Sequence, residues 1–265
     1  MSLSDMSCNG IGDDLFAALR ERRTIEPPSA QHNGMEIDDA YRVSRHFLAR
    51  RMAEGEKLVG KKIGVTSAAV QDMLGVHQPD FGFLTDVMQV PDGGTVSLAA
   101  HGLIQPRAEG EIAFVLRRDL QGPGVTEDDV LDATEYVCPC FEIVDSRITD
   151  WRIAIQDTIA DNASCGVFLL GQARVDPRSL DLAAVAMRID KNGSHAADGL
   201  GSAVQGHPAT TVAWLANTLG EYGIPLLAGE IILSGSLAPL LPAHAGDRFH
   251  LQLEGIGEAT VSFAD

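Results

Sequence analysis

The sequence lacks the long apolar runs of a membrane protein. No window approaches 18 consecutive apolar residues, so we predict no membrane-spanning helix. Residues 1–5 contain no basic region followed by an apolar run, so no secretory signal peptide is predicted and the cytoplasm is the expected location.

Positive charge is also scarce. The 265 residues carry 20 Lys and Arg against 37 Asp and Glu, which gives a formal net charge of −17. This sign argues against non-specific binding to nucleic acid and to anionic membranes, because both partners are themselves negatively charged. An anionic small molecule is not excluded, provided that a metal ion or a local Lys or Arg reverses the field in its pocket.

Several catalytic signatures are missing as well. No glycine-rich phosphate-binding loop is present. The segment 234–236 (Ser-Gly-Ser) is not the nucleophile elbow of a serine hydrolase. The cysteines show no spacing typical of a zinc site, so free thiols in a reducing compartment are expected for Cys8, Cys138, Cys140 and Cys165.

The patterns that are present favour a β-rich core. Apolar positions recur at helical spacing over 11–22 and 37–52, and Gly55 ends the second helix, so residues 1–55 are predicted to form a helical appendage. Over residues 56–265, the main domain, strands outnumber helices and do not alternate regularly with them. This argues against a doubly wound sheet and predicts an α+β fold with a mixed β-roll or distorted barrel core and peripheral helices.

The predicted elements of the main domain are defined by their alternation, capping residues and turns. The predicted strands are 58–65, 95–98, 109–116, 137–144, 166–170, 231–234, 247–253 and 258–263. The predicted helices are 67–74 with Ser67 as its cap, 127–135 with Thr126, 151–160 with Asp150, and 209–221. A hairpin is predicted over 183–196, turning at Asn192-Gly193.

Three acids stand out in the predicted strands. Glu109 and Glu111 are two apart and share a face, while Gly110 leaves room for another backbone or a ligand to approach closely on the other face. They belong either to a solvated strand end or to a divalent metal site. Glu142 interrupts an otherwise apolar strand, and it lies either at an exposed strand edge or beside the other two acids as a third ligand. Carboxylate oxygens favour Mg²⁺, Mn²⁺ or Ca²⁺ over zinc, and three of them leave about half of an octahedral sphere open.

Five segments in the same order resemble one enzyme family over about residue 11 to the end. They are Gly-Lys-Lys-Ile-Gly-Val-Thr at 60–66, Gln-Pro-Asp-Phe-Gly at 78–82, Pro-Arg-Ala-Glu-Gly-Glu at 106–111, Glu-Ile-Val-Asp-Ser-Arg at 142–147 and Ala-Asp-Asn-Ala-Ser at 160–164. These segments resemble the 2-hydroxypenta-2,4-dienoate hydratases of the fumarylacetoacetate hydrolase superfamily.

The resemblance implies a lyase of aromatic meta-cleavage pathways that needs Mg²⁺ or Mn²⁺. It would hydrate 2-hydroxypenta-2,4-dienoate to 4-hydroxy-2-oxopentanoate. It also implies a homo-oligomer, with a complex with 4-oxalocrotonate decarboxylase as a further expectation. By the matching segments, the metal ligands would be Glu109, Glu111 and Glu142, and the acid–base pair would be Lys62 and Asp80.

The residues themselves leave alternatives at several of these positions. A turn-forming role is the alternative for Asp80, and a surface lysine is the alternative for Lys62. Lys61, on the opposite face from Lys62, is interpreted as a surface lysine. Ser164 and Asn162 are candidates for binding the substrate carboxylate, with helix C-capping as the alternative for Asn162. Arg107 is expected to form a structural ion pair with an acid, with pairing to the substrate as the alternative, and a structural ion pair is expected for Arg147.

Three other functions remain open. The first is a 4-oxalocrotonate decarboxylase, which shares most of the five segments. The acid at Asp80 favours the hydratase, since the resemblance implies no acid there in the decarboxylases. The second is an acylpyruvate C–C hydrolase, which is disfavoured because no His–Glu pair is placed in the N-terminal region to activate water. The third is a non-catalytic partner subunit, against which the three acids argue.

Overall fold

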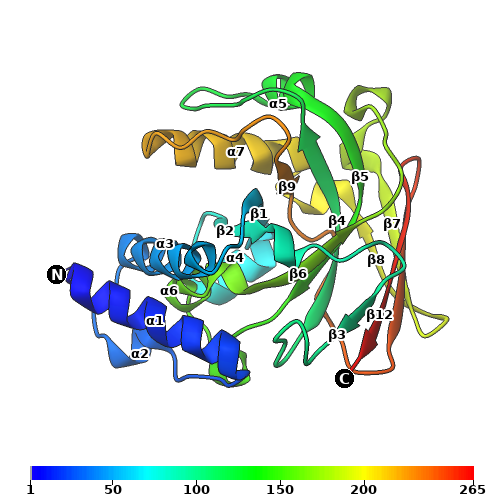
Figure 1. Ribbon diagram of the computed structural model, residues 1–265. Helices are drawn as coiled ribbons and strands as arrows, with labels where there is room; N and C mark the ends of the chain where they lie inside the picture. Colours follow the sequence, from blue (N-terminus) through cyan, green and yellow to red (C-terminus); the bar gives the residue numbers. More distant parts are fainter. Residues whose placement is uncertain (1) are drawn as a thin grey trace.

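Two β-sheets form the centre of the computed structural model, which describes residues 2–265. In chain order the strands are β1 (Leu58–Gly64), β2 (Asp80–Thr85), β3 (Thr95–Ser97), β4 (Arg107–Leu116), β5 (Thr134–Val144), β6 (Cys165–Leu170), β7 (Ala186–Lys191), β8 (Ser194–Leu200), β9 (Ile231–Leu233), β10 (Leu241–Pro242), β11 (Arg248–Leu253) and β12 (Gly257–Ala264). The larger sheet has the order β2-β1-β9-β4-β5-β6, with β10 paired to β4. The smaller sheet has the order β3-β12-β11-β7-β8 and lies on the right of Figure 1.

The helices lie around these sheets, with α1, α3 and α7 on the left of Figure 1. They are α1 (Asp5–Glu21), α2 (Pro28–Gln31), α3 (Ile37–Ala53), α4 (Ala68–Leu74), α5 (Glu127–Ala133), α6 (Ile155–Ala160) and α7 (Pro208–Glu221). Single 3₁₀ turns include η1 (Asp86–Met88), η2 (Thr149–Trp151) and η3 (Asn162–Ser164). Over the described residues, no helix is long and apolar enough to cross a membrane.

The larger sheet curls until its two ends approach each other. A bridge joins Gln89 to Phe168 of β6, and the Val90 amide donates to the Phe168 carbonyl at 2.8 Å. Next to it, the Asn162 side chain replaces a strand partner for Phe83 of β2: its Oδ1 accepts from the Phe83 amide at 2.8 Å and its Nδ2 donates to the Phe83 carbonyl at 2.9 Å. We call this contact the seam of the curled sheet.

The curl divides the side chains of the larger sheet between two clusters. The outer face packs on the smaller sheet and on helices, and its buried members include Phe81, Ile112, Phe114 and Phe141. The inner face is lined by a smaller cluster, whose members are Leu84, Met88, Ala113, Val115, Cys138, Cys140, Cys165, Phe168, Ile231 and Leu233. All four cysteines of the chain are buried free thiols, as expected.

The predicted α+β class and the distorted barrel-like core are confirmed. The caps at Ser67 and Thr126 and the turn at Asn192-Gly193 also agree with the prediction. One cap is wrong: Asp150 has φ of 55° inside η2, and the helix starts five residues later, at Ile155. The predicted strands also lack β2, which pairs with β1 in the structure.

The N-terminal helices pack on α6 as well as on each other. One hydrophobic cluster joins Phe16 of α1 and Phe47 of α3 to Ile155 and Ile159 of α6. The predicted boundary between residues 55 and 56 falls at the turn between α3 and β1, where Gly55 has φ of 103°. The division into an appendage of residues 1–55 and a domain of residues 56–265 stays a prediction.

Candidate active site with a carboxylate cluster

The three predicted ligand acids meet on the inner face of the curled sheet. Glu109 of β4 lies directly opposite Glu142 of β5 in the antiparallel register, and Glu111 is two residues along β4. One carboxylate oxygen from each residue lies within 4.8 Å of the others. The apolar strand that carries Glu142 therefore brings this acid beside the other two, and an exposed strand edge is excluded because Glu142 is fully buried.

Gly110 explains how β4 can carry these acids so close to the core. It faces the smaller sheet, where an added Cβ would lie 2.6 Å from Met187 Sδ and 3.0 Å from Ile189 Cδ1. A side chain at position 110 would therefore push the two sheets apart. The atoms that approach this glycine closely are side-chain atoms of β7 and β11, not the backbone or ligand that was expected.

The carboxylates are short of hydrogen-bond partners. Glu111 Oε2 accepts from the Gly235 amide at 2.8 Å, but Glu111 Oε1 and both oxygens of Glu142 have no hydrogen bond within the described chain. Burial and then the Glu142 charge raise the pKa of Glu109 to about 8, and the same causes raise that of Glu111 well above its usual range. Buried carboxylates are costly unless protons or a cation neutralise them, so this donor set fits a hard divalent cation.

Lys62 of β1 reaches the same cluster. Its Nζ lies 3.2 Å from Glu142 Oε1 and donates to the Ala163 carbonyl at 2.9 Å. Burial alone would lower the pKa of this ammonium, but the surrounding carboxylates, with Glu142 first among them, outweigh it and raise the pKa. Lys62 is therefore a positive charge held within the acid cluster.

Asp80, the first residue of β2, completes the group. It is opposite Gly64 of β1, and Lys62 lies two residues from Gly64 on the same face. An added Cβ at Gly64 would lie 2.3 Å from Asp80 Oδ1, so only glycine leaves room for this carboxylate. Asp80 is 1% exposed, and neither of its oxygens has a hydrogen-bond partner within residues 2–265. Burial raises its pKa to about 6. It begins a strand and is not a turn residue.

The segment Asn162–Ser164 closes one side of the site in an unusual conformation. Its three residues have φ of 57°, 50° and 53°. The left-handed conformation costs a non-glycine residue roughly 1–2 kcal/mol, so the surrounding contacts must hold this turn in place. Asn162 uses its side-chain amide at the seam, whereas the Ser164 hydroxyl lies 3.3 Å from that of Thr158. Sequence reasoning missed Thr158, since a lone threonine on a helix gives no signal.

Lys61, Arg147 and Arg107 each have a different kind of partner. The interpretation of Lys61 as a surface lysine is wrong: it does face away from Lys62, but it is 1% exposed and its Nζ lies 2.6 Å from Glu230 Oε1. Arg147 makes the expected structural ion pair, with Asp161. The structural ion pair expected for Arg107 is wrong for residues 2–265, because its guanidinium instead lies over the Trp151 ring at 4.4 Å from the centroid.

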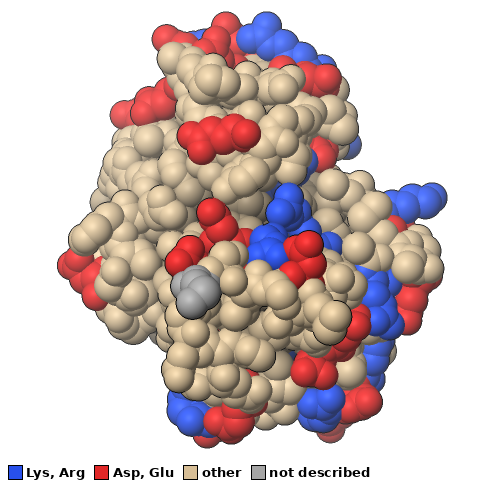
Figure 2. Space-filling model, turned by 90° about the vertical axis from the view of Figure 1, so that its left-hand side faces the viewer, with Lys and Arg blue, Asp and Glu red and all other residues tan. Residues whose placement is uncertain are grey.

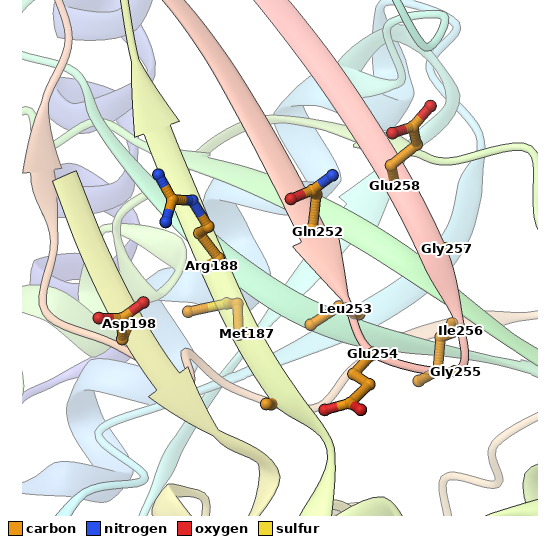
Figure 3. A pocket seen from close by; sticks show the side chains of 11 residues that line it. Met187, Arg188, Asp198, Gln252, Leu253, Glu254, Gly255, Ile256, Gly257 and Glu258 are labelled. Carbon is orange, nitrogen blue, oxygen red and sulfur yellow. The ribbon is translucent and has the colours of Figure 1, made fainter. Parts of the chain in front are cut away.

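Several concavities of the described surface lie away from these acids. A groove of about 690 Å³ crosses the smaller sheet, where Figure 3 shows Arg188, Gln252 and Glu258 on neighbouring strands. A second hollow, of about 230 Å³, lies between α3 and α7 and includes Arg42 and Arg45. Figure 2 views the molecule from the side of these helices, and acidic and basic side chains are interspersed there among neutral ones. Neither hollow contains the carboxylate cluster.

Known proteins resemble the chain in both sequence and structure. The family model described as fumarylacetoacetate (FAA) hydrolase C-terminal matches residues 62–264. A 2-hydroxyhexa-2,4-dienoate hydratase of Comamonas testosteroni is 66% identical over 254 residues, which are 96% of each protein. A 2-hydroxypent-2,4-dienoate hydratase of Pseudomonas putida is 57% identical over 82% of this chain and 97% of its own length.

Solved structures extend the comparison. A 4-oxalocrotonate decarboxylase from Pseudomonas putida G7, complexed with magnesium and adipate, is 34% identical with a TM-score of 0.95, and the match covers 98% of both chains. A fumarylpyruvate hydrolase from Pseudomonas aeruginosa, in complex with Mn²⁺ and pyruvate, shares the fold at 14% identity, with a TM-score of 0.63 over 78% of this chain and 89% of that one. Given the family match over residues 62–264 and relatives more than half identical, the chain belongs to the fumarylacetoacetate hydrolase family.

Proposed function

We propose that the chain is a hydro-lyase that adds water to 2-hydroxypenta-2,4-dienoate or a close homologue, in aromatic meta-cleavage catabolism. The observation that carries this proposal is the meeting of three carboxylates with Lys62 and Asp80 on one buried face. Relatives at 66% and 57% identity are hydratases of 2-hydroxydienoates, which supports the same reaction. The expected product from the five-carbon substrate is 4-hydroxy-2-oxopentanoate.

The proposed cofactor is a divalent metal ion, Mg²⁺ or Mn²⁺, held by Glu109, Glu111 and Glu142. Unpartnered buried carboxylate oxygens are the donors that such ions prefer. When bound, the ion would supply Lewis acidity to the adjacent carboxylate and C2 oxygens of the substrate. The structures of relatives complexed with magnesium and with Mn²⁺ support a divalent ion here.

Lys62 and Asp80, which lie beside the cluster, are proposed to supply positive charge and proton transfer. The Lys62 ammonium adds a fixed positive charge where an anionic substrate must enter an acidic site. Asp80, with its pKa raised to about 6, can exchange a proton near neutral pH. Hydration adds H to C5 and OH to C4, after which the proton of the C2 hydroxyl moves to C3 to give the 2-oxo product. The protein must therefore deliver a proton to C5 and take one from the attacking water. Lys62 and Asp80 are the proposed pair for these two transfers.

Two further residues are proposed to serve the substrate carboxylate. The Ser164 hydroxyl, whose described hydrogen-bond partner is Thr158, would bind the carboxylate directly. Asn162 was expected to do the same, but its side-chain amide pairs with the Phe83 backbone. We therefore propose that Asn162 contributes by holding the turn that carries Ser164.

The test is a direct assay of hydration. Purified protein with Mg²⁺ or Mn²⁺ should lower the absorbance of the dienol and form 4-hydroxy-2-oxopentanoate, and a chelator should stop the reaction.

Decarboxylation is the second candidate, because the 4-oxalocrotonate decarboxylase structure matches at 34% identity over 98% of the chain. Release of CO₂ from oxalocrotonate without any hydration of the dienol would overturn the proposal in favour of that reaction.

We also propose a homo-oligomer in the cytoplasm that can associate with 4-oxalocrotonate decarboxylase, as the family resemblance implies. Size-exclusion chromatography with light scattering, on the purified chain alone and mixed with a decarboxylase, tests both associations. A chain that elutes as a monomer and does not co-elute with the decarboxylase would contradict them. Neither result would affect the proposed chemistry, which needs only the residues of one chain.

A further inference from the structure

A buried arginine holds both ends of the strained turn beside the site. Arg147 is 1% exposed and follows β5. Its Nε lies 2.5 Å from Asp161 Oδ1, and its Nη2 donates to the Asp161 carbonyl at 2.6 Å. Its Nη1 donates to the Cys165 carbonyl at 3.1 Å. One guanidinium therefore contacts the residue before Asn162–Ser164 and the residue after it.

The turn between these two anchors would relax without them. Three successive non-glycine residues with positive φ persist only where their surroundings fix them. Asp161 is itself locked, since its Oδ2 accepts from the Arg147 amide at 2.8 Å. The rigid fork of a guanidinium can bind a carboxylate and two carbonyls at once, which a lysine ammonium cannot match in geometry.

The backbone carbonyl of Ala163, at the centre of this turn, accepts a hydrogen bond from Lys62. Lys62 Nζ donates to Ala163 O at 2.9 Å, and its other close partner in the described chain is Glu142 at 3.2 Å. A shift of the turn therefore breaks the hydrogen bond from Lys62 to Ala163, which fixes the position of the Lys62 ammonium.

We propose that Arg147 is a positioning residue, which places Lys62 for catalysis by fixing the carbonyl of Ala163. This inference rests on the proposed function for its kinetic test. It concerns a residue whose described hydrogen bonds go to Asp161 and Cys165 and not to the carboxylate cluster.

Arg51 of α3 provides a matched control. It is 7% exposed and pairs with Glu56 at 2.7 Å. The guanidinium carbons of Arg51 and Arg147 lie 6.0 Å and 5.8 Å from the centroid of the same Phe47 ring. Arg51 donates to Thr85 but to no carbonyl of the turn. Substituting it thus disturbs the same cluster without releasing Ala163.

The experiment compares Arg147→Lys with Arg51→Lys. Both keep the charge and both should lower the melting temperature. Only Arg147→Lys should lower kcat of dienol hydration, by roughly 10–100-fold as expected for small misplacements of a reacting group, with KM and metal affinity nearly unchanged. An unchanged kcat in Arg147→Lys, or an equal loss in both variants, would overturn the proposal. If Arg147→Lys does not fold, Asp161→Asn, which keeps the side-chain size, replaces it with the same expected result.

A second measurement separates this proposal from the proposed function. The chain has only four lysines, so ¹⁵N-lysine labelling gives few signals, and that of Lys62 is identified by its loss in Lys62→Met. The Lys62 ammonium signal should shift or broaden in Arg147→Lys and stay in place in Arg51→Lys. If the wild-type chain does not hydrate the dienol, this shift still supports the positioning role. An active enzyme whose Lys62 signal is the same in both variants refutes it.

Discussion

The affinity for a divalent metal should depend steeply on pH, because protons compete for the carboxylate cluster. The pKa of Glu109 is raised to about 8 by burial and by Glu142, and that of Glu111 is raised well above its usual range. In the metal-free protein these two acids therefore hold protons at neutral pH. A metal ion that binds to the cluster must displace them.

The size of the effect follows from Glu109 alone. A carboxyl with a pKa of about 8 is ionised in roughly 1% of molecules at pH 6, in roughly 10% at pH 7 and in roughly 90% at pH 9. The apparent Kd for Mg²⁺ or Mn²⁺ should therefore fall by on the order of 100-fold between pH 6 and pH 9. Proton release from Glu111 makes the dependence steeper.

The same shifts fix the sign of the effect on folding. An acid whose pKa is higher in the folded than in the unfolded chain stabilises the fold only while it is protonated. The metal-free protein should therefore lose stability as the pH rises from the ordinary value of 4.5 toward about 8. Metal offsets this loss, so the rise in Tm on adding Mg²⁺ should be larger at pH 8.5 than at pH 6.5.

Calorimetric titration measures both quantities. Titrations in two buffers of different ionisation enthalpy give the number of protons released for each metal ion bound, which we expect to be at least one at pH 6.5. Glu109→Gln should make the pH dependence shallower by one proton. A Kd that is constant between pH 6 and pH 8, with no proton released, would refute the reasoning.

Three substitutions test separate parts of the site and fold. Glu142→Gln should abolish metal retention and hydration while circular dichroism stays native; full activity would exclude Glu142 as a ligand. Asp80→Asn should lower turnover far more than metal affinity, because its oxygens lie outside the carboxylate cluster; the opposite pattern would make Asp80 a ligand or a structural residue. Lys61→Met should lower the free energy of unfolding by roughly 3–5 kcal/mol, since it leaves Glu230 buried without its cation. Denaturant titration measures that loss, and an unchanged midpoint would mean that Glu230 finds another partner.

Local patterns predicted much of this fold because alternation, caps and turn residues act over a few positions. Glu109 and Glu111 share a face by strand geometry alone, and Thr126 caps its helix as its sequence position predicts. β2 was not predicted as a strand because Pro79, Asp80 and Gly82 are residue types typical of turns, whereas the structure buries the segment on both faces.

Long-range contacts decided the remaining points. Nothing near Lys61 in sequence reveals Glu230, which is 169 residues away and forms its buried partner. The helix expected to begin after Asp150 is broken because Asp150 and Trp151 both take φ of 55°. Gly12 lies within α1 and lets α3 approach, since an added Cβ would lie 2.9 Å from His46 Cδ2.

The seam has a consequence for the behaviour of the protein in concentrated solution. β2 and β6 end the hydrogen-bonded order of the larger sheet, and unpaired edge strands invite pairing between molecules. Here the two edges of the sheet contact each other at the seam, which protects them from pairing with another molecule. Part of this protection depends on the side-chain amide of Asn162. Slow deamidation of this side chain would set an oxygen against the Phe83 carbonyl and reopen the edge. Deamidation of Asn162 would thus expose a strand edge on which other molecules could pair and aggregate.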